Sequence, residues 1–240
     1  MLWAQDVVFT IDSPEIGTRK IRVHLPEDYD EQNRRYPVLY LHDAQNLFDA
    51  KTSFAGEWRV DETLDSLHAK IIVVGIDNGS EKRLDELTPY PNAKHGGGQG
   101  KNYVNFIVNT LMPKINSSFR TKTGRRNTAI GGSSLGGLIS WYAALEHPGV
   151  FGKALIFSPS LWYSDDIYKL TASKKRIRTK TYLLAGDSES KGMVPEAEKL
   201  VKLIGPKMRD RDLKFTIVPG GKHNEKLWAQ SFAKAYLWLF

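Results

Sequence analysis

A glycine- and serine-rich run at residues 131–137, Gly-Gly-Ser-Ser-Leu-Gly-Gly, contains the residue types of a serine nucleophile turn. The run follows a short apolar strand pattern and leads directly into an apolar helix pattern. In a Gly-x-Ser-x-Gly turn the serine lies at a strained corner between strand and helix, and the glycines let neighbouring backbone pass without a Cβ clash. Ser134 fits this register, with Gly132 before it and Gly136 after it. Ser133 lacks the second glycine, so Ser134 is the candidate nucleophile.

A serine hydroxyl is a weak nucleophile at neutral pH, so it needs a base within hydrogen-bond reach and an acid that orients the base. In hydrolases with this turn, the acid and then the histidine follow the serine along the chain. Two histidines follow Ser134. His147 stands at the end of a predicted helix, before Pro148, whereas His223 follows the last predicted strand and precedes the last helix. We therefore expect His223 to be the base.

Two carboxylates compete for the role of the acid. Asp187 and Glu189 both follow the strand pattern at residues 181–185. A carboxylate buried here would fix the tautomer of the imidazole and stabilise the imidazolium that forms during attack. Spacing alone does not choose between the two, so one is expected to be the acid and the other a solvated loop residue.

Short β-branched runs alternate with helical patterns along the chain, which indicates α/β architecture with a mostly parallel sheet. The predicted strands are residues 7–11, 20–25, 37–42, 71–76, 128–131, 154–157, 181–185 and 214–218. The first two are close together and predict an antiparallel hairpin at one sheet edge. The predicted helices are residues 103–116, 135–146, 195–208 and 225–239. Because reactive groups gather at the carboxyl ends of parallel strands, the candidate residues should meet at one edge of this sheet.

The composition fits one α/β domain over residues 1–240. The chain is 41% hydrophobic and contains no low-complexity linker, so it can bury one sizeable core. It has no cysteine, which excludes disulfides, thiolate metal sites and cysteine nucleophiles. Its six histidines show no metal-ligand spacing. We expect neither a metal nor a cofactor.

The beginning of the sequence lacks the basic end and apolar run of a signal peptide, and no stretch approaches 18 apolar residues. We expect a soluble cytoplasmic protein with no membrane partner, or a secreted one if a leader has been removed. The net charge is +7, and basic residues cluster at 122–126 and 174–180. Neither cluster has interleaved aromatic residues for base stacking, so a solvated surface is favoured and no nucleic-acid partner is expected. Attraction of an anionic substrate remains open.

Five segments carry a resemblance to a known family. They are residues 36–49 (Tyr-Pro-Val-Leu-Tyr-Leu-His-Asp-Ala-Gln-Asn-Leu-Phe-Asp), 74–78 (Val-Gly-Ile-Asp-Asn), 132–137, 158–162 (Ser-Pro-Ser-Leu-Trp) and 221–225 (Gly-Lys-His-Asn-Glu). The chain resembles the "putative esterase" family of α/β-hydrolases, which contains esterase D, feruloyl esterases, enterochelin esterases and mycolyltransferases. In that family the acid falls three residues after a strand-end glycine. The resemblance therefore implies Glu189, three residues after Gly186, with Asp187 as the alternative.

The resemblance also implies an oxyanion hole. It assigns the backbone amide of Gln45, after the third strand, and the amide of Leu135, after the nucleophile. Two such amides each contribute about 3 to 4 kcal/mol to transition-state stabilisation. Ala44 stands where the family commonly has glycine, and alanine tolerates a positive φ less well. The path of this loop therefore depends on whether Ala44 has to adopt a positive φ.

A second glycine-rich string, His-Gly-Gly-Gly at residues 95–98, matches the oxyanion-hole motif of some lipases. It follows the fourth predicted strand instead of the third, which favours a mobile rim loop. A phosphate-binding loop would need glycine at His95 and serine or threonine at Asn102, so nucleotide binding is not favoured.

These features predict a serine esterase, a carboxylic ester hydrolase that acts through an acyl-enzyme intermediate. The connection at residues 158–180 is too short for a large helical lid domain, so the site should be open to a small-molecule or carbohydrate ester, feruloyl esters included. Four aromatic residues are candidates for substrate contacts: Trp58, Tyr90, Trp162 and Tyr163. The alternatives are an acyltransferase of the same fold and a noncatalytic binding module. The sequence leaves the natural ester and the oligomeric state open.

Overall fold

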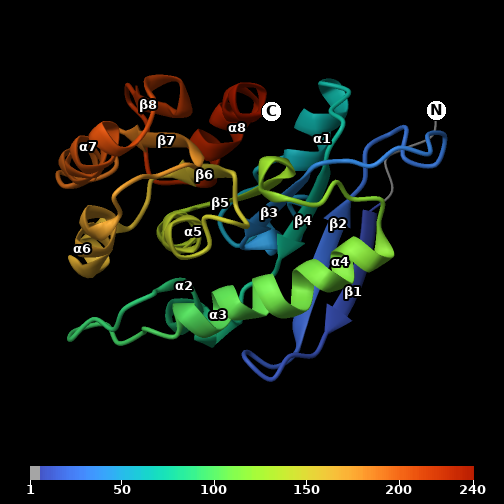
Figure 1. The fold of residues 1–240 in the computed structure, drawn as a ribbon, viewed down its shortest axis with the longest axis horizontal. Coiled ribbons are helices and arrows are strands. Elements are labelled where there is room, and N and C mark those ends of the chain that lie inside the picture. The colour runs from blue at the N-terminus through green and yellow to red at the C-terminus, as the bar shows by residue number, and fades with distance from the viewer. Residues whose placement is uncertain (1–5) are drawn as a thin grey trace.

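An eight-stranded sheet forms the centre of the computed structural model, which describes residues 6–240 (Figure 1). The strands lie in the order β1-β2-β4-β3-β5-β6-β7-β8. Their bounds are β1 (Asp6–Ile11), β2 (Arg19–His24), β3 (Val38–His42), β4 (Ile72–Ile76), β5 (Thr128–Ser133), β6 (Lys153–Phe157), β7 (Lys180–Gly186) and β8 (Leu213–Val218). Each lies at one of the eight predicted positions, because the short β-branched runs between turn residues are strong local signals.

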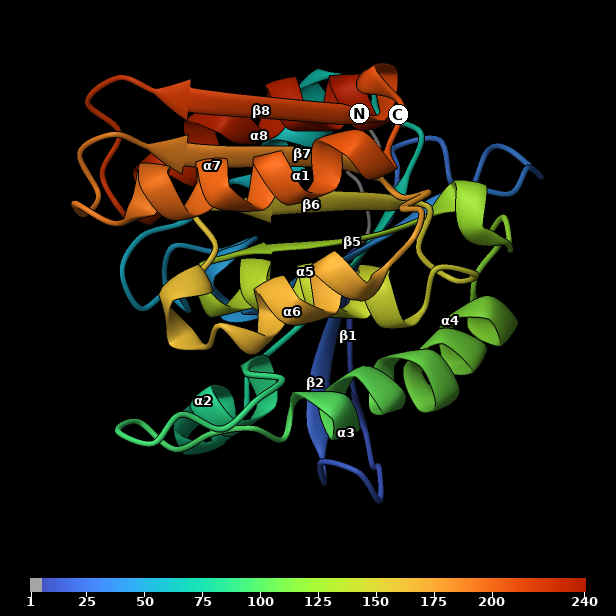
Figure 2. The ribbon, with the colours of Figure 1, turned by 60° about the vertical axis from the view of Figure 1, so that its left-hand side comes forward.

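The direction of the strands places the loops that matter. β1 pairs antiparallel with β2, as the predicted edge hairpin requires, and β2 pairs antiparallel with β4. All pairings from β4 across to β8 are parallel. The carboxyl ends of these six strands therefore meet at one edge; in Figure 2 the arrowheads of β6, β7 and β8 all point to the left.

Helices cover both faces of the sheet. Their bounds are α1 (Val60–Ser66), α2 (Arg83–Leu87), α3 (Gly100–Phe106), α4 (Met112–Ser118), α5 (Leu135–Glu146), α6 (Asp166–Ser173), α7 (Met193–Ile204) and α8 (Glu225–Leu239). α1 and α8 share one apolar cluster with β3 residues Leu39 and Leu41. α3 to α7 share the other with Val38 and Tyr40. Figure 2 shows α5, α6 and α7 in front of the sheet and α8 behind it.

The helical segments differ from the prediction in two respects. The predicted helix at 103–116 forms, but a π-helical turn at Ile107–Leu111 separates α3 from α4. Pro113 follows this turn and has no N–H to donate to the preceding turn, which explains the irregular hydrogen bonding. The short helices α1, α2 and α6 were not predicted, because five to eight residues give too little periodicity. α6 is the longest helix between β6 and β7, so no large lid occupies this connection.

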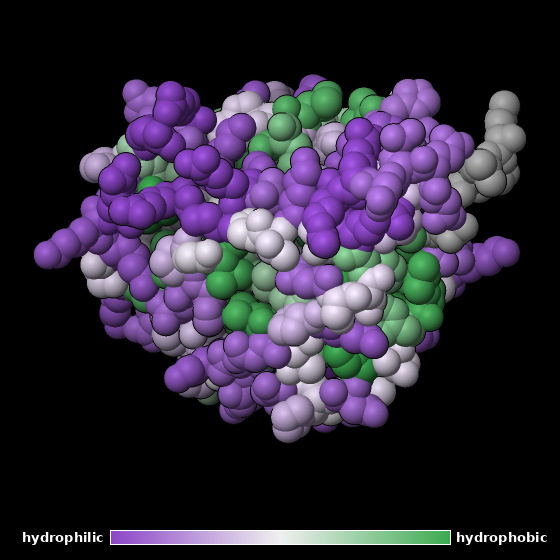
Figure 3. Space-filling model, turned by 45° about the vertical axis from the view of Figure 1, so that its right-hand side comes forward, coloured by the Kyte–Doolittle hydropathy of each residue, from purple (hydrophilic) through white to green (hydrophobic). Residues whose placement is uncertain are grey.

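Hydrophilic side chains cover most of the upper half of the face shown in Figure 3, and apolar side chains form smaller areas below them. Among the described residues, no helix has the length and apolar character needed to cross a bilayer.

Candidate active site

The loops at the carboxyl edge of the sheet surround a cavity of about 690 Å³. The loops after β3, β5 and β8 contribute Gln45, Ser134 and His223 to its lining. Strand direction alone predicts this meeting of loops that are far apart in the sequence. Candidate residues from three separate loops therefore surround one space.

Ser134 lies at the corner between β5 and α5 in a strained backbone conformation, with φ 56° and ψ −123°. A Cβ at Gly132 would lie 3.0 Å from the carbonyl carbon of Gly136, so the two glycines allow the close crossing that the motif predicts. The backbone N–H of Ser134 donates to the carbonyl of Phe157 at 3.0 Å, which anchors the corner to the end of β6. Strain held in this way is typical of functional turns.

His223 lies in a hydrogen bond with Glu189. The distance from His223 Nδ1 to Glu189 Oε2 is 2.5 Å. The Glu189 side chain is only 1% exposed, whereas the imidazole is 36% exposed. Asp187 points elsewhere: it is exposed, and its Oδ1 accepts from the N–H of Gly220 at 2.7 Å. Of the two carboxylates in this loop, the structure brings Glu189 to the histidine.

The remaining oxygen of Glu189 is also fully engaged. Oε1 accepts from the N–H of Gly186 at 2.5 Å and from the hydroxyl of Ser158 at 2.7 Å. The indole N–H of Trp228 in turn donates to Ser158 Oγ at 2.9 Å, and the Trp228 ring meets the His223 ring edge-on at 5.1 Å. The sequence did not identify Ser158 or Trp228 as residues of the candidate active site. The available signal was the position of Ser158 directly after β6, at the same sheet edge as the other candidates.

Ser134 and His223 line the same cavity, but they are not hydrogen-bonded to each other. Within residues 6–240, the hydroxyl of Ser134 interacts with the hydroxyl of Ser160 at 3.2 Å. Nδ1 of His223 faces Glu189, which leaves Nε2 as the nitrogen that can serve a reacting group. In ligand-free structures such catalytic contacts are often long and tighten only with substrate bound.

The loop after β3 bends at Asp43, whose φ is 56°, and continues as a 3-10 turn over Ala44–Asn46. Ala44 itself avoids positive φ and is buried, so the alanine is accommodated. Gln45 and Leu135 each stand at the start of a helical turn, where backbone amides lack an intrahelical acceptor. Neither amide donates to any acceptor among residues 6–240. Both are available as donors.

Asp43 is held by a charged clamp. Arg83 donates to both of its carboxylate oxygens, at 2.7 and 2.9 Å, and the Asn78 side chain donates at 2.7 Å. Burial acts to raise the pKa of Asp43, but the hydrogen bonds and charge of Arg83 outweigh it, so the pKa lies below its usual value. The backbone N–H of Asn78 also donates to the Gln45 side chain at 3.3 Å. These contacts fix the loop that carries the Gln45 amide. Arg83 belongs to α2, which sequence reasoning did not detect.

The comparison with known families decides the relationship. The model of the family described as "Putative esterase" matches residues 13–239. The chain belongs to this esterase family. The resemblance based on the five sequence segments is thereby confirmed, and so is the class of enzyme, a carboxylic ester hydrolase.

Individual relatives agree with the family. The esterase is 26% identical over 246 residues to the uncharacterized protein YbbA of Bacillus subtilis (strain 168), an alignment that covers 96% of each chain. It is 29% identical over 154 residues to the ferri-bacillibactin esterase BesA of the same strain, covering 57% of this chain and 52% of BesA. A solved structure of a ferulic acid esterase superposes with a TM-score of 0.75, covers 100% of this chain and 98% of its own, and is 16% identical. The shared fold is the α/β-hydrolase fold.

The four aromatic residues expected to contact substrate lie outside the cavity lining: Trp58, Tyr90, Trp162 and Tyr163. Trp58 is 3% exposed and packs against Phe157 at 5.5 Å and Trp228 at 5.8 Å, so it is a core residue beneath the site. The aromatic side chains that do line the cavity are Phe54 and Trp228. Phe54 is 93% exposed. The sequence did not identify it as a substrate-contact residue, because it is a single aromatic residue in a polar loop.

The glycine-rich loop at 95–98 packs against the 3-10 turn Leu161–Tyr163 instead of the esterase cavity. The hydroxyl of Tyr163 donates to the carbonyl of Gly96 at 2.6 Å, and the ring of Trp162 meets the ring of His95 at 5.5 Å. Tyr90 packs edge-on against Tyr142 at 6.0 Å. The structure thus places Trp162 and Tyr163 against this loop, and Tyr90 against α5.

Gly186 and Gly221 bring the loops after β7 and β8 into backbone contact. A Cβ at Gly186 would collide with the carbonyl oxygen of Gly221, which also accepts from the N–H of Ser188 at 3.0 Å. This close approach sets the separation of Glu189 and His223, because each follows one of the two glycines by two or three residues.

We expect Gly186→Ala to destabilise the esterase by about 1 to 3 kcal/mol, because backbone must shift to admit the methyl group. Urea unfolding monitored by circular dichroism measures this change. Gly205→Ala is the matched control, since no atom lies within 4 Å of its added Cβ. Equal stability of the two variants would contradict the proposed role of the glycine contact.

Proposed function

We propose that the esterase hydrolyses carboxylic esters through Ser134 as nucleophile, His223 as general base and Glu189 as the orienting acid. The observation that carries the proposal is the 2.5 Å hydrogen bond between His223 Nδ1 and the buried Glu189, at the rim of the cavity that holds Ser134. A buried carboxylate on Nδ1 sets the tautomer that leaves Nε2 free to accept a proton.

The reaction proceeds in two acyl-transfer steps. His223 Nε2 takes the proton of the Ser134 hydroxyl as Oγ attacks the ester carbonyl carbon, and the carbonyl oxygen becomes an oxyanion. The free amides of Gln45 and Leu135 donate to that oxyanion. Collapse of the intermediate breaks the ester C–O bond, and the imidazolium returns its proton to the departing alcohol. A water molecule, deprotonated by His223, then attacks the acyl carbon. The bond from that carbon to Ser134 Oγ breaks, the imidazolium returns its proton to Oγ, and the acid is released.

The hydroxyl of Ser134 changes partner during this cycle. In the substrate-free structure it interacts with Ser160, and a serine hydroxyl can rotate about its Cα–Cβ bond to reach a different acceptor. Ser160 is buried, and its backbone N–H donates to the carbonyl of Ser134 at 3.0 Å. Ser160 therefore holds the nucleophile in a resting position at the cavity surface.

The cavity suits an ester with a hydroxyl-bearing part and an aromatic or acyl part. Asn46, Asn78 and Ser80 present amide and hydroxyl groups to it, and Phe54 and Trp228 present apolar surface. Such a mixed lining is typical of small-molecule sites in which a few polar groups set the orientation. By their names, BesA acts on ferri-bacillibactin and the solved structure is an esterase of ferulic acid. A small polar ester, including a feruloyl ester of a carbohydrate, is the substrate class that we infer.

The test is direct chemical trapping of the nucleophile. A fluorophosphonate should label the folded esterase once, and peptide mass spectrometry should locate the adduct on Ser134. The same labelling should abolish hydrolysis of p-nitrophenyl acetate and methyl ferulate in proportion to the fraction modified. Labelling at a different residue, or hydrolysis that survives complete modification of Ser134, would contradict the proposal.

A further inference from the structure

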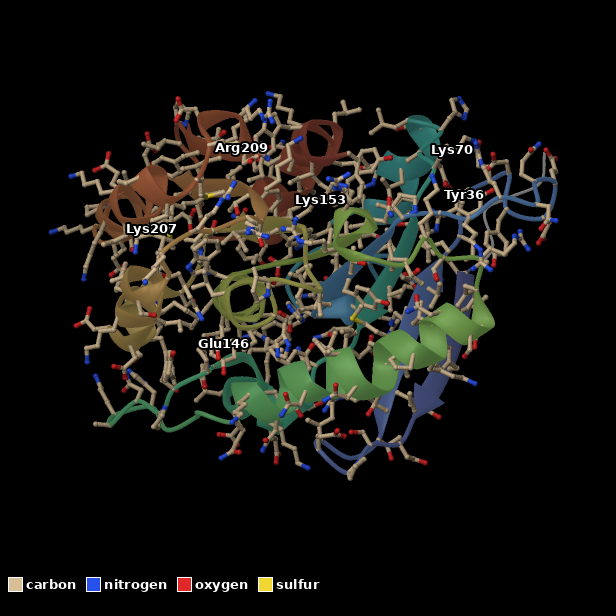
Figure 4. The ribbon with its side chains drawn as sticks, viewed as in Figure 1. Tyr36, Lys70, Glu146, Lys153, Lys207 and Arg209 are labelled. Atoms are coloured by element: carbon tan, nitrogen blue, oxygen red, sulfur yellow. The ribbon has the colours of Figure 1, made fainter. Side chains whose placement is uncertain are left out.

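A second cavity, of about 620 Å³, lies at the opposite edge of the sheet, beside the amino ends of the strands. We call it the basic cavity, because its lining contains six cationic side chains: Arg125, Lys175, Arg176, Arg178, Lys207 and Arg209. They belong to the segments that lead into β5, β7 and β8. Figure 4 labels Lys207 beside α6 and α7, on one side of the molecule.

The residues that line the basic cavity do not supply enough negative charge to neutralise its six cations. Asp212 is the carboxylate in the lining, and it already pairs with Arg209 at 2.7 Å. Lys175, Arg176 and Arg178 are exposed, and their side chains have no hydrogen-bond or ion-pair partner among residues 6–240. Several cations therefore face one concave space with no anion to neutralise them.

The walls of the basic cavity are built from parts of the chain that are held together. Arg125 donates through Nη2 to the backbone carbonyl of Arg178 at 2.8 Å, which joins the segments before β5 and β7. The N–H of Ile177 donates to the carbonyl of Lys207 at 2.9 Å, and Lys207 Nζ donates to the carbonyl of Thr171 at 3.0 Å. Three segments separated in the sequence thus present their cations to the same space.

Repulsion between the cations is a consequence of this arrangement. Burial and then the positive charges of Arg178 and Arg126 lower the pKa of Arg125 below its usual value. A bound anion relieves such repulsion and gains charge-assisted hydrogen bonds.

We propose that the basic cavity binds a small multivalent phosphate anion, at a site separate from the ester cavity. Guanidinium groups offer paired donors that match phosphate oxygens, and the cavity has four of them within its lining. Its apolar lining residues are Ile177, Pro206 and Met208, and none is aromatic, so the base-stacking platform of a single-stranded nucleic-acid site is missing from it. The shared chemistry is a phosphate chain, either free or attached to a nucleoside.

Isothermal titration calorimetry with inorganic tripolyphosphate at constant, physiological ionic strength tests the proposal. We expect saturable binding by the full chain at one site. The triple variant Lys175→Gln, Arg176→Gln, Arg178→Gln should bind roughly tenfold more weakly or worse, because it loses three charge-assisted donors. ATP titrated in parallel separates the two sources: equal affinity for both indicates recognition of the phosphate chain alone, and tighter ATP binding adds a contact with the nucleoside.

A charge-matched variant is the control. Lys94→Gln, Lys101→Gln, Lys191→Gln removes the same charge from exposed lysines outside the basic cavity and should leave tripolyphosphate affinity unchanged. Equal weakening in both triple variants would show nonspecific attraction to net charge and overturn the proposal, as would absence of binding by the parent chain. Hydrolysis of p-nitrophenyl acetate should be the same in both triple variants, which verifies their folding. The single variant Arg176→Gln repeats the comparison if the triple variant unfolds.

Discussion

Ser134→Ala should lower kcat for p-nitrophenyl ester hydrolysis by about ten-thousandfold or more, with little change in KM. In the proposed mechanism the alanine removes the atom that forms the acyl-enzyme bond, whereas the cavity proposed to bind the ester keeps its shape. The amides of Gln45 and Leu135 remain, so a residual rate above the uncatalysed reaction is expected. Initial rates over a range of ester concentrations, measured on variant and parent side by side, give both constants.

The matched control is Ser133→Ala, at the last residue of β5 and one position before Ser134. Ser133 also borders the cavity and is 7% exposed, but it lies outside the Gly-x-Ser-x-Gly register. Its replacement should retain activity within roughly tenfold of the parent. A folded Ser134→Ala enzyme as active as Ser133→Ala would refute Ser134 as the nucleophile.

The sequence predicts the parts of this protein that depend on local pattern. The eight strands and α5 and α8 follow from apolar periodicity between turn residues, and the strained corner at Ser134 follows from the spacing of two glycines. Strand direction then places the loops after β5, β7 and β8 at one edge without any further information. Local signals thus locate the candidate site, although they do not assign every group in it.

What the sequence does not predict depends on where side chains point. Asp187 and Glu189 share a loop, so their spacing alone does not choose between them. The family resemblance favoured Glu189, and the directions of the two side chains show that Glu189 meets His223. Trp58 is an aromatic residue that serves the core as readily as a binding site, since burial of its ring is favourable in both places. Arg83 gave no signal because the short helix that carries it is defined by its contacts with the rest of the fold.

The sequence also did not predict that basic residues from separate segments would meet in the fold. As sequence, the clusters at 122–126 and 174–180 are two solvated runs. In the fold, the hydrogen bond from Arg125 to Arg178 joins them, and Lys207 and Arg209 arrive from a third segment. Charge density at one point in space is a property of the topology, and no linear pattern reveals it.

Glu189→Gln should lower kcat by about a thousandfold to ten-thousandfold, whereas Asp187→Asn should leave it nearly unchanged. The amide of the glutamine keeps one oxygen to accept from Gly186 and Ser158, so the buried loop retains those hydrogen bonds. Its NH₂ group then faces His223 Nδ1 as a donor. That contact favours the imidazole tautomer with the proton on Nε2, which cannot accept the proton of Ser134.

The comparison separates a catalytic from a structural contribution because both variants are near-isosteric. Asp187 is exposed and accepts one backbone N–H, a role that the asparagine oxygen preserves. Urea unfolding should show small changes in both variants, and steady-state kinetics should show a large change in Glu189→Gln alone. A larger loss of kcat in Asp187→Asn would reassign the acid. Equal, small losses in both would mean that His223 works without an orienting carboxylate, and the mechanism would then rest on Ser134, His223 and the two amides.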